Sequence, residues 1–521
     1  MTIHWIVAPV LTPALAAALM VLVGERRLRA QRALGVASCV ALVVIAADLV
    51  VRSLSGIVLP YFVGSWQAPF GIALVLDRLA ALMLALTAVV ALAALIAAVV
   101  GRDSVDARGR HFHPLFQFQL MGLNGAFLTG DLFNLFVFFE VVLLASYCLL
   151  LHGRGAARLR AGVPFVVVNL AASGLFLLGV SLLYAATGTL NMADLALRVP
   201  RVAAADVPLA RAAALLLLVV FAVKAAAFPL YLWLPRAYSA AHAPVAALFA
   251  IMTKLGVYSI VRVHGVIFGP GAGDAALVAG PWLLVAALAS SAVGVAGTLG
   301  APTLGRMTAY LTVASVGTLL IAVALLSAPG LGAAFYYSVH STLAIGALFL
   351  LAAEIGARRG ASGDELRPGA AVARPFAVGV ALIVASASIA GLPPFSGFVG
   401  KLMILGATRS APASPVLWTA ILATGFLAMV ALARGGSILF WKGGETPVAG
   451  RASRAALAPP FALLACGIAL AVFAAPVKRF TDAAARQIAD TPRYAARVLG
   501  DPGADTVRPY PGGIRPGGGK P

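Results

Sequence analysis

Charged residues are scarce in this chain of 521 residues, since only 11 % are Asp, Glu, Lys or Arg. A soluble globular chain carries roughly a quarter of charged residues, so this composition excludes a soluble domain. Hydrophobic residues make up 62 % of the chain instead, and the mean hydropathy is +1.00. These values are typical of a protein that lies largely within a membrane.

Cysteine is also rare. Cys39, Cys148 and Cys466 lie in separate apolar runs without the paired spacing of a disulfide or of a metal cluster. The chain contains no flavin, iron–sulfur or quinone signature either. We therefore expect neither a metal nor a cofactor, and we expect the three cysteines to pack as ordinary core residues.

Lysine is the least used of the basic residues, with six among 38 Lys and Arg. Three of the six, Lys224, Lys254 and Lys401, lie inside long apolar runs. A charged side chain at the bilayer centre costs about 2.5–3.5 kcal/mol, so such residues usually face a bundle interior and act there. Because a buried lysine can lose its proton whereas arginine keeps its charge, the choice of lysine indicates proton exchange.

Long apolar runs recur along the whole chain. Each run of about 18 or more residues can span a bilayer as a helix. We predict an all-α membrane protein with about 14 transmembrane helices. The first run is not expected to be a cleaved signal peptide, because its positive charges follow the run instead of preceding it.

The net charge of +20 would fit a nucleic-acid partner, but its distribution argues against one. The arginines gather in alternate gaps between the apolar runs. They include Arg26, Arg27, Arg29, Arg32, Arg154, Arg158, Arg160, Arg358 and Arg359. This alternation follows the positive-inside rule and predicts that the N-terminus lies outside. The basic residues therefore serve topology and contact with anionic membrane lipid, and we expect no nucleic acid as a partner.

Two apolar runs are interrupted by proline. One contains Pro229, and the other contains Pro393 and Pro394. Proline removes a backbone donor and clashes with the preceding turn, so each helix should break within the membrane. Paired broken helices point to inverted repeats, and we infer two repeats of about five helices at 114–263 and 278–440. Two unrelated proline kinks are the alternative.

The remaining segments flank these repeats. Residues 1–113 are predicted to form N-terminal peripheral helices, with a short external β-hairpin at 52–77. A C-terminal helix is expected within 441–475. The stretch 476–521 begins with an amphipathic, interfacial segment and ends in a Pro/Gly-rich tail that we expect to be disordered.

Glu140 is the acidic member of the buried charged set, about eight residues into its apolar run. One interpretation is a proton-carrying carboxylate paired with Lys224, since intramembrane ionisable residues are usually functional. The other is a salt bridge that holds two helices together. An ion pair at this depth can do both, because each charge stabilises the ionised form of the other.

The other lysines lack such a partner. Glu354 is the only acidic candidate for Lys254, and it lies beside Arg358 at the end of a run. A lysine without a counter-ion is the most easily neutralised, so we predict Lys254 as the midpoint of a relay. Lys401 follows the double-proline break and should line the exit, with snorkelling to the interface as the alternative.

His340 is a further candidate, because an unperturbed imidazole titrates near neutral pH. It could equally hydrogen-bond a neighbouring residue. Polar residues in the runs could hold water between the titrating groups, or could simply join helices. They are Asn169, Ser173, Thr312, Ser315, Ser386 and Ser388. Tyr258 and Arg262 are expected at the membrane interface.

Three motifs carry a family resemblance. Residues 124–153 read NGAFLTGDLFNLFVFFEVVLLASYCLLLHG and closely resemble the D-type subunit of the multi-subunit Mrp-type (Pha, Mnh) cation/proton antiporters. Residues 223–262 and the run GLPPFSGFVGK at 391–401 resemble the wider antiporter-like family. That family includes the proton-pumping chains of respiratory NADH:quinone oxidoreductase and of membrane-bound hydrogenases. The resemblance extends from about residue 70 to 445.

The resemblance implies fourteen helices and two inverted five-helix repeats, with helices 7 and 12 broken. It places the central hydrophilic axis of the family on Glu140, Lys224, Lys254 and Lys401. One position departs from the pattern, because many relatives carry a lysine where this chain has Ile345. That departure puts more weight on His340, or on water alone, between Lys254 and Lys401.

These observations predict a secondary-transport subunit and not an enzyme. The chain would carry the proton route of a Na⁺ or K⁺/H⁺ antiporter in the bacterial inner membrane, together with subunits of the A, B, C, E, F and G types. The alternative is a proton-pumping membrane subunit of a redox-driven complex. A passive cation channel is disfavoured, because buried lysines would repel the cations.

Overall fold

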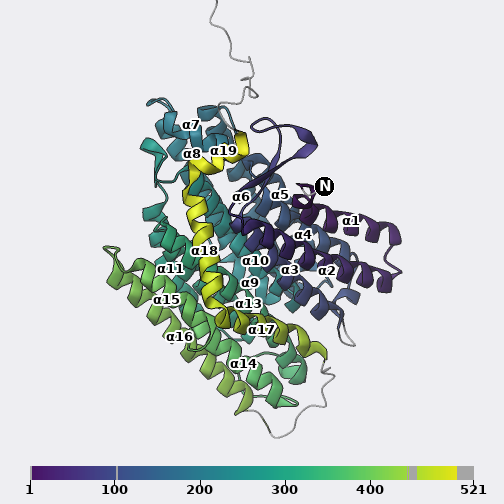
Figure 1. Ribbon diagram of the computed structural model, residues 1–521. Helices are drawn as coiled ribbons and strands as arrows, with labels where there is room; N and C mark the ends of the chain where they lie inside the picture. The colour runs from purple at the N-terminus through teal and green to yellow at the C-terminus, as the bar shows by residue number, and fades with distance from the viewer. Residues whose placement is uncertain (1–2, 101–103, 443, 445–454, 501–521) are drawn as a thin grey trace, which may run out of the picture.

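The computed structural model describes residues 3–100, 104–442, 444 and 455–500. The described part is almost entirely helical, as predicted (Figure 1). Eleven of its helices are long and apolar enough to cross a membrane. The chain is a multi-pass membrane protein, and each apolar run predicted to span contains at least one helix.

The N-terminal part consists of three long helices and one hairpin. The helices are α1 (Ala8–Val23), α2 (Leu28–Ser53) and α3 (Arg78–Val99). Between α2 and α3, strands β1 (Leu59–Phe62) and β2 (Ala73–Leu76) pair antiparallel, with Leu59 opposite Leu76. The hairpin predicted within 52–77 is therefore confirmed.

The two proposed repeat segments contain most of the remaining helices. The first holds α4 (Phe112–Leu128), α5 (Leu132–Leu151), α6 (Ala156–Thr187), α7 (Met192–Arg198), α8 (Val207–Ala225), α9 (Trp233–Ala240) and α10 (Ala243–Ile260), which continues as the π-helix η5 (Val261–Ile267). The second holds α11 (Gly280–Leu299), α12 (Leu304–Val323), α13 (Ala328–Arg358), α14 (Pro375–Ala390), α15 (Ser396–Thr408) and α16 (Ser414–Phe440).

Both helix breaks lie where proline predicted them. The helix α8 ends at Ala225, four residues before Pro229, and the chain resumes as α9. The helix α14 ends at Ala390, before Pro393 and Pro394, and the chain resumes as α15. The apolar run that contains Pro393 and Pro394 thus forms two helices, as predicted.

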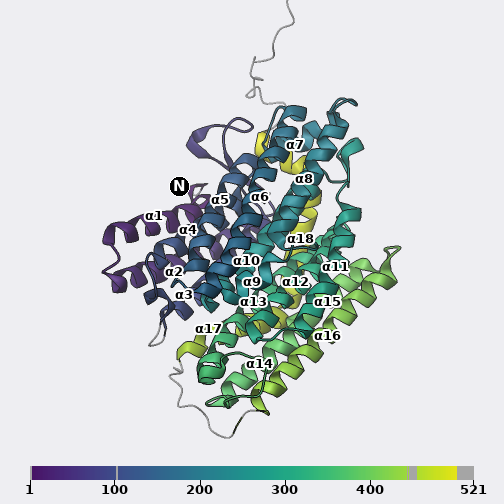
Figure 2. The ribbon, with the colours of Figure 1, turned by 180° about the vertical axis from the view of Figure 1, so that it is seen from behind.

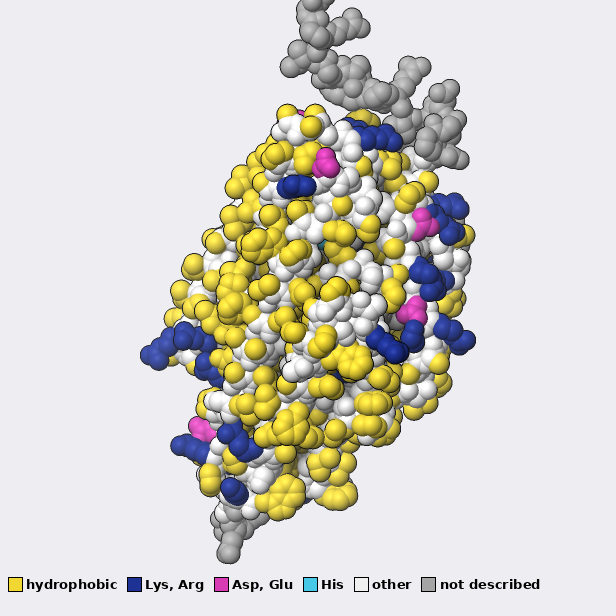
Figure 3. Space-filling view, turned by 90° about the vertical axis from the view of Figure 1, so that its left-hand side faces the viewer, with side chains coloured by type: hydrophobic (Ala, Val, Ile, Leu, Met, Phe, Trp, Pro, Cys, Tyr) yellow, Lys and Arg dark blue, Asp and Glu magenta, His cyan; other side chains and the backbone are white. Residues whose placement is uncertain are grey.

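The core lies at α10, α12 and α13. The spanning part of α10 is completely buried, and most of α12 and α13 is buried as well. The helix α13 packs against α10, α12, α14, α15 and α17 (Ala458–Val472). In both ribbon views α14 and α16 lie together at one end of the molecule, with α1 on the opposite flank (Figures 1 and 2). Hydrophobic side chains cover most of the outer face, and Lys and Arg gather towards its edges (Figure 3).

The C-terminal part ends in two amphipathic helices, α18 (Ala474–Ala489) and α19 (Thr491–Leu499). The helix α18 buries Thr481, Ala484, Ala485 and Ile488, and it packs on α13, α3 and η5. The helix α19 packs on α7. The amphipathic character predicted for this stretch is confirmed. The predicted Pro/Gly-rich tail lies outside the described residues.

Tyr258 and Arg262, which the sequence predicts at the membrane interface, are both buried within the protein in a charged network. The Arg262 guanidinium donates to both carboxylate oxygens of Asp77, with Nη2 2.7 Å from Oδ1. Its Nε donates to the Tyr258 hydroxyl at 2.8 Å. Asp77 also caps α3 by accepting from the Ala80 amide. The long arginine side chain therefore turns inward to a partner from α3.

We expect Asp77→Asn to lower the free energy of unfolding by about 3–5 kcal/mol, because it leaves the Arg262 charge buried and unpaired. Asparagine is itself a good N-cap, so the change removes the charge of Asp77 and keeps the cap of α3. Asp48→Asn is the control, since its exposed ion pair with Arg52 within α2 is worth only about 0.3–0.5 kcal/mol. Thermal unfolding of both purified variants measures the difference. Equal melting temperatures would contradict the assignment.

Candidate functional site

Lys224 lies in the last turn of α8, beside the first helix break, and is only 4 % exposed. Its ammonium nitrogen lies 3.3 Å from the backbone carbonyl oxygen of Asn169 and 3.3 Å from the side-chain oxygen of the same residue. The ammonium also lies 5.8 Å from the centre of the Phe139 ring, where a cation is attracted by the π-system. Both α5 and α6 thus contribute to the lysine site.

Glu140 on α5 is linked to the Lys224 site through residues of α6. Its carboxylate accepts a hydrogen bond from the Ser173 hydroxyl, and that hydroxyl lies 3.1 Å from the Asn169 carbonyl oxygen. Within the described residues, no oxygen of Glu140 lies within 4.0 Å of the Lys224 nitrogen. The predicted pairing of Glu140 with Lys224 is therefore indirect. Asn169 and Ser173, one turn apart on α6, bridge the two charges.

The break after α8 leaves backbone groups that neighbouring side chains satisfy. Ala226 adopts a left-handed conformation, with φ of 56°, where the helix stops. The Trp233 indole donates to the Val223 carbonyl at 3.2 Å, and the Phe228 amide donates to the Ser290 hydroxyl of α11 at 2.8 Å. In a membrane interior, such partners are what makes a broken helix tolerable.

Lys254 on α10 is 1 % exposed and has little to hold its charge. Its ammonium nitrogen lies 3.5 Å from the neighbouring Thr253 hydroxyl, which is long for a hydrogen bond. Glu354, the acidic candidate considered from the sequence, forms an ion pair with Arg358 one turn away. Among the described residues, Lys254 therefore has no carboxylate partner.

A glycine brings Lys254 close to the first break. A Cβ atom at Gly256 would lie 2.4 Å from the Ala225 amide nitrogen and 2.8 Å from the Lys224 carbonyl carbon. The backbone of α10 thus touches the broken end of α8. This contact places Lys224 and Lys254 on adjoining turns of two helices that pack without intervening side chains.

His340 lies on α13, which packs against α10 with Lys254 and against α15 with Lys401. Its Nδ1 is 3.0 Å from the Ser396 hydroxyl at the start of α15, and the side chain is buried. The imidazole interacts electrostatically with both Lys254 and Lys401. A cavity with a water-accessible volume of about 10 Å³ adjoins it, lined also by Ser388. That volume is about the minimum that holds one water molecule.

Lys401 on α15 turns into the protein and does not snorkel. Its ammonium nitrogen donates to the carbonyl oxygens of Ile389 at 3.1 Å and Ala390 at 2.7 Å. These carbonyls end α14, where a helix leaves acceptors unpaired and carries partial negative charge. A Cβ atom at Gly425 of α16 would lie 2.9 Å from the ammonium nitrogen, so the glycine makes room for it.

The five residues predicted from the sequence thus lie in one row on helices that pack against one another in the order α5, α6, α8, α10, α13 and α15. Glu140 is half-buried, and the other four residues are buried. Residues of α6 join Glu140 to Lys224, and the helix that carries His340 packs against those that carry Lys254 and Lys401. Sequence reasoning missed Ser396 as the partner of His340. Its position two residues after Pro394 was the available signal, because residues that follow a break contact the neighbouring helices.

Two broken helices and buried lysines in a multi-pass membrane protein are typical of ion-translocating membrane subunits. The family model described as "NADH:quinone oxidoreductase/Mrp antiporter, TM" matches residues 129–429. The chain belongs to this family.

Curated relatives narrow the comparison. A protein of Rhizobium meliloti, named as a probable K⁺/H⁺ antiporter subunit of the D type, is 40 % identical over 96 % of this chain and 98 % of its own. A Bacillus subtilis protein, named as a Na⁺/H⁺ antiporter subunit of the D type, is 37 % identical over 77 % of this chain and 80 % of its own.

Solved structures agree with this fold. A chain of the Mrp complex from Dietzia sp. DQ12-45-1b superposes with a TM-score of 0.87 at 29 % identity, over 96 % of this chain and 100 % of that one. A chain of an archaeal membrane-bound sulfane sulfur reductase superposes with a TM-score of 0.84 at 24 % identity, over 95 % and 99 %. The second likeness shows the fold alone.

We expect Gly256→Ala to destabilise the protein by about 1–3 kcal/mol, because the added methyl group would overpack α10 against the end of α8. Gly174→Ala on α6 is the matched control. A Cβ atom there meets nothing within 4 Å, so the helix should gain up to about 1 kcal/mol. Melting temperatures of the two purified variants test the contact. A Gly256→Ala protein as stable as the Gly174→Ala protein would show that the two backbones are not in contact.

Proposed function

We propose that this chain is the proton-translocating subunit of a hetero-oligomeric Na⁺ or K⁺/H⁺ antiporter of the bacterial inner membrane. The observation that carries the proposal is the row of the half-buried Glu140 and the buried Lys224, Lys254, His340 and Lys401. Ionisable side chains at this depth usually serve transport, because burying them without a role is costly. The named relatives are antiporter subunits, which supports the same function for this chain.

The other subunits of the complex would be partners of this chain. Relatives are named as one lettered subunit each, and a structural neighbour is part of a multi-subunit complex. The arginine-rich loops favour an orientation with the N-terminus outside. In this arrangement the chain is a transport subunit and has no enzymatic role of its own.

The first step takes place between Glu140 and Lys224. A proton that reaches Glu140 neutralises the carboxylate, and the attraction that it exerts on the Lys224 ammonium disappears. Because an opposite charge stabilises the ionised form of its neighbour, the lysine then releases its proton more readily. Asn169 holds the ammonium in place and Ser173 holds the carboxylate. The two groups therefore change their protonation and not their position.

The second step passes through Lys254 towards Lys401. Lys254 has no counter-ion, so its charged form is held weakly and the proton moves on. His340 is the group that would connect this residue with Lys401, because the imidazole lies on α13 and this helix packs against both α10 and α15. The carbonyl oxygens at the end of α14 stabilise the charged form of Lys401, which makes it a terminal station.

The segments 114–263 and 278–440 act as the two repeats in this proposal. In each segment a helix stops before a proline, and a buried lysine lies at that break: Lys224 in the last turn of α8, and Lys401 hydrogen-bonded to the end of α14. Paired breaks of this kind mark the ion pathway in transporters built from repeats. The flanking segments 1–113 and 441–475, and the C-terminal stretch, would support this pair from outside.

The rival function, proton pumping in a redox-driven complex, has weaker support. The antiporter relatives are 40 % and 37 % identical. The matched chains of the sulfane sulfur reductase and of Thermus thermophilus complex I are 24 % identical, so they share only the fold.

We expect Glu140→Gln and Lys224→Ala each to reduce cation/proton exchange at least tenfold in vesicles that contain the whole assembly. Each change removes one charge of the first step while the bridge on α6 remains. Asp48→Asn and Lys442→Ala are charge-matched controls on exposed side chains. Exchange is measured as cation-dependent collapse of a pH gradient, alongside the amount of assembled complex. Full exchange in both axis variants would refute the proton station.

We expect Lys254→Arg to abolish exchange as well, because a guanidinium keeps its proton. The change preserves the positive charge, so it separates proton transfer from electrostatic attraction. Lys478→Arg on α18, at an exposed position, is the conservative control. Exchange at the normal rate in the Lys254→Arg assembly would mean that only the charge matters there.

A further inference from the structure

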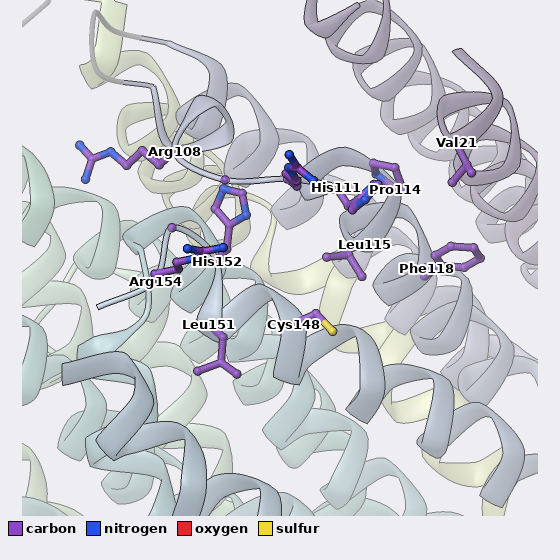
Figure 4. A pocket seen from close by; sticks show the side chains of 13 residues that line it. Val21, Arg108, His111, Pro114, Leu115, Phe118, Cys148, Leu151, His152 and Arg154 are labelled. Atoms are coloured by element: carbon purple, nitrogen blue, oxygen red, sulfur yellow. The ribbon is translucent and has the colours of Figure 1, made fainter. Parts of the chain in front are cut away.

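A second polar site lies away from the buried row, in a pocket of about 680 Å³ at the arginine-rich side of the protein. It lies among the end of α1, the start of α4 and the end of α5 (Figure 4). The proposed proton pathway uses none of its residues. Its rim and its wall differ sharply in chemistry.

The rim is basic. Arg108, Arg110 and Arg154 line it together with His111 and His152. Glu25 forms ion pairs with Arg110 and His111, which neutralises only part of this charge. Among the described residues, neither Arg154 nor the nearby Arg158 forms an ion pair, so this side of the rim is positively charged.

A further arginine adds to this charge from behind. Arg158 donates to the carbonyl oxygen of Gly153 at 3.3 Å and also to the carbonyl of Arg154. Its guanidinium lies close enough to Arg108 for the two charges to repel each other. An anion in the pocket would relieve this repulsion.

The wall of the pocket is apolar. Leu115 and Phe118 of α4 and Cys148 of α5 line it, beside Val21 of α1. The apolar surface continues outward from the pocket, since Leu22 next to Val21 is 82 % exposed. A ligand that fits both rim and wall has an anionic head and a hydrocarbon tail.

The backbone around the rim is arranged in an unusual way. His111 and Arg154 both adopt left-handed conformations, with φ of 59° and 56°, which non-glycine residues rarely do. Strained backbone of this kind tends to gather at binding sites. The two strained residues face the same pocket from different elements (Figure 4).

A buried histidine nitrogen nearby lacks a partner. Among the described atoms, His242 Nε2 makes no hydrogen bond, and it lies 3.1 Å from where a Cβ atom of Gly153 would be. Burial, and then the charges of Arg158 and Arg108, lower the pKa of His242 to about 4. The ring is therefore neutral near pH 7, and it has a nitrogen available beside the pocket edge.

We propose that this pocket binds the phosphate-bearing headgroup of an anionic phospholipid. The arginines bind the phosphate, and the acyl chains lie along Leu115, Phe118 and the exposed face of α1. Basic pockets between membrane helices bind such headgroups in other proteins. A free phosphate ion would satisfy the rim but would leave the apolar wall uncovered, so the wall favours the lipid.

The first experiment measures lipid retention by the purified whole assembly. The double variant Arg108→Gln/Arg154→Gln is compared with Arg367→Gln/Arg374→Gln, which removes the same charge from exposed positions elsewhere. Quantitative lipid mass spectrometry should find at least fivefold less phosphatidylglycerol and cardiolipin bound to the pocket variant. The control should stay within twofold of the unmodified protein. Equal retention in the two variants would overturn the proposal.

The second experiment identifies the occupant. A photoreactive benzoylphenylalanine replaces Phe118, and the assembly is irradiated in membranes. An adduct with the mass of a phospholipid supports the proposal, whereas a crosslink to another subunit overturns it.

A third measurement compares free phosphate with lipid. Thermal stabilisation of the unmodified assembly by phosphatidylglycerol, but not by inorganic phosphate, is expected. Equal stabilisation by inorganic phosphate would show an ion site and would overturn the assignment to lipid.

Discussion

The carbonyl oxygens at the end of α14 and the ammonium of Lys401 depend on each other inside an apolar protein. A helix that stops in the membrane leaves acceptors without partners, and each unsatisfied group there costs several kcal/mol. A lysine buried in the same place would be equally costly if left alone. The hydrogen bonds from Lys401 to Ile389 and Ala390 meet both requirements. A proton on this lysine is thus part of what stabilises the broken helix, which links protonation to the structure of the break.

The same requirement is met differently at the first break. Lys224 contacts Asn169 of α6 and not the end of its own helix, while Trp233 and Ser290 satisfy the freed backbone groups. Lys224 can therefore lose its proton in response to Glu140 while the hydrogen bonds at the break stay in place.

Small residues make both lysine sites possible. Gly256 lets α10 touch α8, and Gly425 makes room for Lys401. The helices that carry the row pack against one another in order, and α10 meets α8 at backbone distance.

Much of this arrangement was predictable, because its causes are local. Proline breaks a helix through its own ring, so the ends of α8 and α14 followed from Pro229 and Pro393. Apolar length predicted the helices, and lysine in an apolar run predicted the titrating positions. Partners across the fold were not predictable. Asn169 lies 55 residues from Lys224, and Asp77 lies 185 residues from Arg262. The sequence does not say which helices pack together, so it predicts a direct pair of Glu140 with Lys224 and gives no partner for Arg262.

The central claim is that solvent and side chains join Lys254 to Lys401 by way of His340. A map of the whole assembly by electron cryo-microscopy, at a resolution that shows ordered water, tests this claim most directly. The account predicts water molecules that contact the Lys254 ammonium and the His340 imidazole and that extend towards Lys401. Continuous dry packing of apolar side chains between Lys254 and His340 would contradict it.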